Sequence, residues 1–186
     1  TCFDNKLNQG EQDIDCGDAS CISCDLKNSQ PLKVSFLEIF DNGNKTITVL
    51  GEINNPNIVV GAEKVFYTVN LLDRNGNNIF SKTKETFIYP GKNRTIIEAG
   101  IAIDPSLAFK GELKLGEVTW LQENWFGEIV EKKLTINETT IQEKGNQFIL
   151  SGTINNANAI KLDQVIIKAV LLNKDDLRQA ASFTLI

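Results

Sequence analysis

The chain has 186 residues, of which 41% are hydrophobic and 23% charged, so it can bury a core and is unlike a disordered polymer. It contains no histidine, which excludes catalytic triads and metal sites that depend on imidazole. The net charge of -5 lies within residues 1–25, which hold six acids and one lysine, whereas 18 bases balance 18 acids in the remainder. We therefore expect no nucleic-acid binding, because the chain offers no excess of basic residues for phosphate contacts.

The first 30 residues form an acidic segment with all four cysteines of the chain, Cys2, Cys16, Cys21 and Cys24. Because the segment has few apolar residues, it needs cross-links in order to fold. An even number of clustered cysteines indicates disulfides and an oxidising compartment, so we predict two disulfides and export. Of the three possible pairings we favour Cys2 with Cys16. A zinc site is the alternative, although a single C-x-x-C pair matches ribbon-type zinc sites poorly.

The segment also resembles a cysteine segment that recurs in exported bacterial and archaeal surface proteins. The residues that carry the resemblance are Cys2, Asp4, Asn8, Glu11, Asp15, Cys16, Gly17, Cys21 and Cys24. Asn5 and Asp18 stand where that pattern has glycine, and both residue types tolerate a left-handed backbone. The resemblance implies export and display at the cell surface rather than an activity.

Oxygen-bearing side chains are frequent in the same segment. They are the ligand type that Ca²⁺ prefers, and no nearby base neutralises them. Calcium is therefore the one candidate cofactor, with a solvated acidic loop and no cofactor as the alternative. The predicted ligands are Asp4, Asn8, Glu11, Asp13 and Asp15.

Residues 31–123 are predicted to form a first β-sandwich. Ile47, Val49, Gly51 and Ile53 alternate with residues of the other face, and the same period of two recurs at 65–71 and 95–103. The stretch 74–78 contains an Asn-Gly turn signal. One helical turn is expected at 104–111, capped at its first residue and stopped by Gly111.

Three aromatic residues lie between the end of this sandwich and a predicted linker at 124–132. We predict that they form an interface between domains, with a sugar-binding platform as the alternative. These residues are Trp120, Trp125 and Phe126.

Residues 133–186 repeat the first unit and predict a second, incomplete sandwich. The stretch at 47–57, ITVLGEINNPN, recurs at 148–158 as FILSGTINNAN, and that at 65–73, VFYTVNLLD, recurs at 165–173 as VIIKAVLLN. This second copy has no counterparts of the strands expected at 94–103 and 113–121. Three explanations are open: the chain continues past Ile186, a neighbouring subunit donates strands, or the fold closes differently.

Strand spacing and Asn- and Gly-rich turns predict an all-β fold of tandem immunoglobulin-like antiparallel β-sandwiches, preceded by a small disulfide-rich segment. The stretches 51–54 with 69–73, and 152–155 with 169–173, resemble a family of prokaryotic extracellular domains named for an F-x-L-Y-D motif. Aliphatic residues stand at the aromatic positions of that motif, and Asn173 replaces its aspartate. The resemblance implies an extracellular, non-catalytic domain.

Together these patterns predict a structural or adhesion protein of the cell surface that is not an enzyme. One form of this prediction is a subunit of a filament or appendage, completed by strand pairing between subunits. The expected partners are copies of itself or other surface proteins; no segment is apolar and long enough to span a membrane. The alternative is a calcium-dependent module that binds a glycan or a protein. Sequons at Asn44, Asn93 and Asn137 are candidate glycosylation sites.

Overall fold

The computed structural model describes residues 2–121, 134–145, 147–159 and 161–186. Its fold is all-β with antiparallel strand pairing throughout the described sheets, as the sequence predicted. One short helix, α1 (Cys24–Lys27), ends the cysteine-rich segment. No helix among the described residues has the length and apolar character needed to cross a bilayer.

The first six strands form a sandwich of two three-stranded sheets. The first sheet has the order β1 (Lys33–Asp41), β2 (Ile47–Asn54), β5 (Asn93–Ile101). The second has the order β4 (Asn78–Ile88), β3 (Gly61–Leu72), β6 (Lys110–Leu121). Because β1 contacts β6 and β4 contacts β5, the central strands β2 and β3 lie opposite each other.

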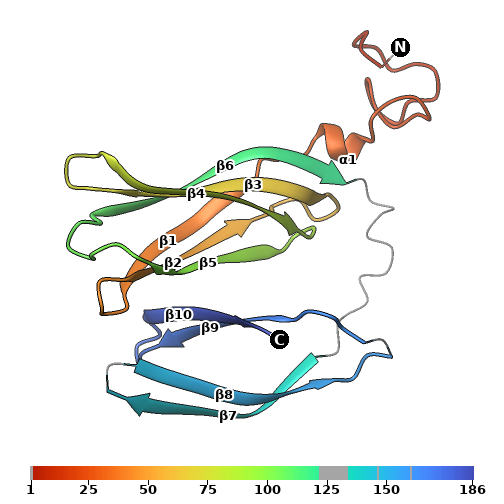
Figure 1. Ribbon diagram of the computed structural model, residues 1–186. Helices are drawn as coiled ribbons and strands as arrows, with labels where there is room; N and C mark the ends of the chain where they lie inside the picture. Colours follow the sequence, from red (N-terminus) through yellow and green to blue (C-terminus); the bar gives the residue numbers. More distant parts are fainter. Residues whose placement is uncertain (1, 122–133, 146, 160) are drawn as a thin grey trace.

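The last four strands form two hairpins. One pairs β7 (Leu134–Lys144) with β8 (Gln147–Asn156), and the other pairs β9 (Ile166–Leu172) with β10 (Arg178–Leu185). Figure 1 shows that the four sheets are stacked in layers, with the β9–β10 hairpin between the β1–β2–β5 sheet and the β7–β8 hairpin. The second half therefore has both hairpins of the first half and lacks, among its described residues, the strands equivalent to β5 and β6.

Equivalent side-chain hydrogen bonds occur at equivalent positions of the two halves. Asp73 Oδ1 accepts from the amides of Asn75 and Asn77, and Asn173, 100 residues later, accepts from Asp175 and Leu177. These side chains close the β3–β4 and β9–β10 hairpins in the same way.

The second asparagine of each repeated Asn-Asn pair binds the backbone amide two residues later. Asn55 Oδ1 accepts from the Asn57 amide, and Asn156 Oδ1 accepts from the Asn158 amide. In the first half Asn55 is fully buried and also donates to the carbonyls of Val60 and Tyr89.

The core of the first sandwich follows the predicted alternation in β2 and β3, but not in β5, where a register shift puts Ile96 and Ile101 in this core and Ile97 on the other face. Ile47, Val49 and Ile53 of β2 pack with Val69 and Leu71 of β3, and all five are fully buried. A period of two places these side chains on one face of each strand. Burial of each such apolar side chain stabilises the pair of sheets by about 1.5–3 kcal/mol.

The expected helical turn at 104–111 is smaller than predicted. One turn closes with the Leu107 amide donating to the Asp104 carbonyl, but Gly111 already belongs to β6. A Cβ at Gly111 would lie 2.2 Å from Cδ2 of Leu37, so this glycine permits β6 to cross β1 closely and does not stop a helix.

Candidate functional site

The cysteine-rich segment is held by two disulfides, but not with the predicted pairing. Cys2 is bonded to Cys21 and Cys16 to Cys24, so the expectation of Cys2 with Cys16 is wrong. A backbone bridge between Asp13 and Cys16 forms a tight turn, and α1, capped by Ser23, places Cys24 beside it. The pairing follows from these turns, which the cysteine spacing alone does not reveal.

The acidic side chains of this segment bind backbone amides. Asp15 is almost completely buried, and its Oδ1 accepts from the amides of Asp4 and Asn5 at 3.0 and 3.1 Å. Asp4 accepts from the Asn8 side chain and the Lys6 amide, and the Asn8 bond contributes most to holding the pKa of Asp4 below its usual value. Glu11 accepts from the Asn8 amide at 3.0 Å. Most of the predicted calcium ligands thus shape the loop.

One group of candidate metal-ligating atoms does come together among the described residues, formed by Cys2, Glu11, Asp18 and Cys21. Both sulfurs belong to the same disulfide, so they are not thiolate ligands and two carboxylates remain. Only Glu11 belongs to the predicted calcium set, and Asp13 instead accepts from the Ile14 amide. Calcium binding stays a prediction.

The other predicted sites lie apart from this segment. Asn44 is exposed in a turn, Asn137 is exposed on β7, and Asn93 is exposed but bonded to Asn54 and Glu52. Trp120 packs against the core of the first sandwich, while Trp125 and Phe126 lie outside the described residues. The predicted aromatic interface is therefore untested, and so is the linker at 124–132.

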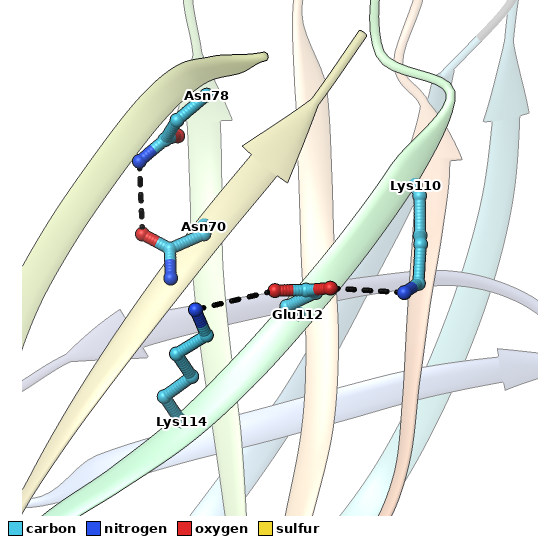
Figure 2. A network of polar contacts seen from close by, with 5 residues as sticks. All are labelled: Asn70, Asn78, Lys110, Glu112 and Lys114. Carbon is cyan, nitrogen blue, oxygen red and sulfur yellow. Dashed lines mark hydrogen bonds and ion pairs between the residues drawn. The ribbon is translucent and has the colours of Figure 1, made fainter. Parts of the chain in front are cut away.

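The outer face of the β4–β3–β6 sheet has the polar character of a solvated surface. Figure 2 shows Glu112 between Lys110 and Lys114, with Nζ to carboxylate distances of 2.9 and 3.5 Å, beside an Asn78–Asn70 hydrogen bond. Exposed ion pairs of this kind contribute little to stability but keep a sheet face soluble.

The outer face of the β1–β2–β5 sheet is apolar and is covered by β10. Leu50 and Ile97 are buried there with Ala181, and Phe36 and Phe40 pack around them. The sequence contained a signal for this second buried face that the prediction missed: Leu50 and Ile97 stand at outward positions of strands whose inward positions are already apolar.

Polar contacts fix the same interface. Arg178 Nη1 lies 2.7 Å from Glu38 Oε1, and its guanidinium stacks over the Phe36 ring at 3.8 Å. Lys168 Nζ donates to the Thr95 carbonyl, and burial with the nearby Arg94 charge lowers the pKa of Lys168 to about 8. The β9–β10 hairpin is thus anchored on the first sandwich by one face.

The other face of the β9–β10 hairpin borders an open groove. The groove has a volume of about 900 Å³ between the β7–β8 and β9–β10 hairpins. The β8 residues that line it include Phe148 and Leu150, which are 55% and 47% exposed, whereas their equivalents Ile47 and Val49 are fully buried. The face that forms a core in the first half is therefore open to solvent in the second.

A buried carboxylate lies inside the first sandwich. Glu98 points from β5 into the first sandwich, 4% exposed, with Lys84 Nζ at 2.6 Å and Lys82 Nζ at 3.0 Å. Burial, and secondarily the Glu98 charge, raise the pKa of Tyr67 to about 12. Sequence analysis missed this cluster, although an acid at an inward strand position was visible.

Comparisons with known proteins add little to this geometry. No protein-family model matches the chain, and no curated protein does. Among solved structures, the chain is similar to the crystal structure of a DUF1425 family member from Shewanella sp. pv-4, at 15% identity and a TM-score of 0.38, covering 47% of this chain and 79% of that one. A likeness of this degree carries no argument about function.

Proposed function

We propose that this chain is a non-catalytic structural or adhesion protein of the cell surface, built from immunoglobulin-like sandwiches and completed by strand pairing with a neighbouring subunit. The observation that carries the proposal is the open groove of the second half, which is lined by the exposed β8 residues Phe148 and Leu150. Exposed strand edges and apolar faces of this size are ordinarily protected, so an assembly partner is the simplest reason for their presence.

The disulfide-bonded segment supports an extracellular location. Two disulfides in fewer than 25 residues are stable in oxidising surroundings and are rare in a reducing cytosol. The segment precedes β1 and projects from the far end of the first sandwich (Figure 1), which suits a head group held away from the layers below.

A non-catalytic role is supported by the chemistry available. The chain has no histidine, and the buried carboxylate Glu98 is paired with two lysines inside a packed sandwich rather than directed into a cleft. In the disulfide-bonded segment, the acidic residues Asp15 and Glu11 bind backbone amides.

Localisation and electron microscopy test this function together. We expect antibodies against residues 1–30 to label intact producing cells, and surface extracts to contain the chain in ordered assemblies with its cysteines oxidised. Recovery of the chain only from the cytosol, with four reduced thiols, would contradict the proposal. The control is a variant with serine at all four cysteines, which should lose antibody recognition of the folded head while the sandwiches stay folded.

A further inference from the structure

Arg94 of β5 is held in place by two contacts with β4. Its Nε donates to Thr86 Oγ1 at 2.8 Å, and its guanidinium carbon lies 4.6 Å from the centre of the Phe87 ring. One edge and one face of the planar group are therefore occupied, which fixes its orientation. The two terminal nitrogens donate to no protein group in the part of the chain that the structure describes, so their N–H groups are available to a ligand.

Lys168 of β9 reaches the same stretch of β5. Its Nζ donates to the carbonyl of Thr95, the residue that follows Arg94 in the chain. An ammonium group has three donors, so two remain beyond this bond. Burial, and secondly the Arg94 charge, lower the pKa of Lys168 to about 8, so the two cations lie near enough to repel each other. Lys168 is nevertheless an exposed residue, which a ligand can reach.

No acidic side chain of the described residues compensates these two charges. Within those residues, neither Arg94 nor Lys168 forms an ion pair. The carboxylate of Glu98, which also belongs to β5, is held by Lys82 and Lys84 instead. Two neighbouring cations that are partly removed from water repel each other and lose hydration, and an anion between them relieves both costs.

A second cation of the β9–β10 hairpin shows the arrangement that Lys168 lacks. Arg178 of β10 also lies against the β1–β2–β5 sheet, beside which Figure 1 shows the hairpin, and Glu38 of β1 supplies its counter-charge at 2.7 Å. Both cations reach the first sandwich from the same hairpin, but only Arg178 has an acid there among the described residues. The counter-charge that is missing beside Lys168 and Arg94 is what an anion from outside the chain would supply.

The donors of this pair favour one shape of anion. A guanidinium binds two oxygens of one group through parallel N–H bonds, and it recognises carboxylates and phosphates in this way. A carboxylate has two oxygens, which the arginine alone satisfies. Sulfate and phosphate groups carry at least three acceptor oxygens, so one remains for the ammonium group of Lys168. A site made of one guanidinium and one ammonium therefore prefers a tetrahedral oxyanion.

We propose that Arg94 and Lys168 form a binding site for a sulfate or phosphate group at the contact between β5 and the β9–β10 hairpin. The group is supplied either as the free ion or as a substituent of a sulfated glycan, and the chemistry that recognises it is the same for both. Because the two ligating residues come from different halves of the chain, the bound anion also stabilises the contact between them. The inference goes beyond the proposed function and does not depend on it.

Calorimetric titration of the full chain with sodium sulfate, sodium phosphate and sodium acetate, at constant ionic strength, tests the site. We expect sulfate and phosphate to bind with millimolar or tighter affinity, and acetate at least about fivefold more weakly because it lacks the third oxygen. Arg94→Gln and Lys168→Met should each weaken sulfate binding at least about tenfold, whereas Lys168→Arg keeps the cation and should stay within about threefold. Arg74→Gln and Lys114→Met, at exposed cations elsewhere, are the matched controls and should leave the affinity unchanged.

A sulfated disaccharide in the same titration identifies the source of the anion. Affinity at least about tenfold tighter than that of inorganic sulfate, and lost in Arg94→Gln, assigns the site to a sulfated glycan, and a smaller difference assigns it to the free ion. Hydrogen exchange at residues 166–185 of each variant checks that the hairpin is still docked, so that lost binding is not mistaken for lost structure. The inference is overturned if neither sulfate nor phosphate binds at tens of millimolar, if acetate binds as tightly as sulfate, or if the control variants lose as much affinity as Arg94→Gln and Lys168→Met.

Discussion

Replacing one isoleucine in each half tests whether the second half lacks part of its core. Ile53 and Ile154 are equivalent residues of β2 and β8, 101 positions apart. Ile53 is fully buried, and β2 is flanked on both sides, with Val34 and Arg94 paired to this position. Ile154 lines the open groove, and among the described residues Ile136 of β7 is its one cross-strand neighbour.

The expected costs differ because only one substitution creates a closed cavity. Neighbouring strands prevent collapse around position 53, so Ile53→Ala should lower the free energy of unfolding by about 3–4 kcal/mol, within the range for buried aliphatic truncations. For Ile154→Ala the lost contacts are partly replaced by water, and we expect less than about 1 kcal/mol. With an m-value of about 2 kcal/mol/M, the first change shifts the urea midpoint by about 1.5–2 M.

Urea unfolding followed by circular dichroism measures both variants, and hydrogen exchange assigns each effect to a half of the molecule. Equal losses of stability would refute the reasoning, because they would mean that Ile154 is enclosed as completely as Ile53. A larger loss for Ile154→Ala would do so more strongly.

Four further predictions concern the interface, the buried ion pairs and the head. Ala181→Asp should release the β9–β10 hairpin, seen as faster exchange at 166–185, with little change in the first sandwich; Ala180→Asp, on the opposite face, is the control. Glu98→Leu should change stability by no more than about 1 kcal/mol or increase it, because Lys82 and Lys84 are half exposed and can return to water; a loss above 3 kcal/mol would show that the ion pairs are required. The pKa of Lys168 is lower in the folded chain than its ordinary value of 10.5, so the folded state should gain stability as pH rises from about 8 toward 10.5, and Lys168→Met should remove that gain in urea unfolding. Calorimetry at millimolar calcium should give heat of binding if the head holds the ion, and no heat above dilution would end that prediction.

The local structure of this protein was determined largely by its sequence. The period of two at Ile47, Val49 and Ile53 predicted strands with one apolar face, because alternate side chains of a strand point to the same side. The Asn-Gly signal after Asp73 predicted the hairpin, and the clustered cysteines predicted disulfides. These features depend on neighbouring residues, so they can be read along the chain. The repeat likewise predicted equivalent hairpins in the two halves.

The tertiary structure decided what each face of those strands meets. The disulfide partners depend on turns around Asp15, whose carboxylate binds amides ten residues away, and the position of Gly111 depends on a distant leucine. The burial of Leu50 depends on a hairpin more than 100 residues later, and Leu150 is exposed because no strand of the described residues lies at the position that β5 has in the first half. In the sequence both leucines lie within the same repeated apolar stretch, and nothing nearby in the chain distinguishes the buried one from the exposed one. Burial is set by which surfaces come together in space, and alternation alone does not specify what covers a face.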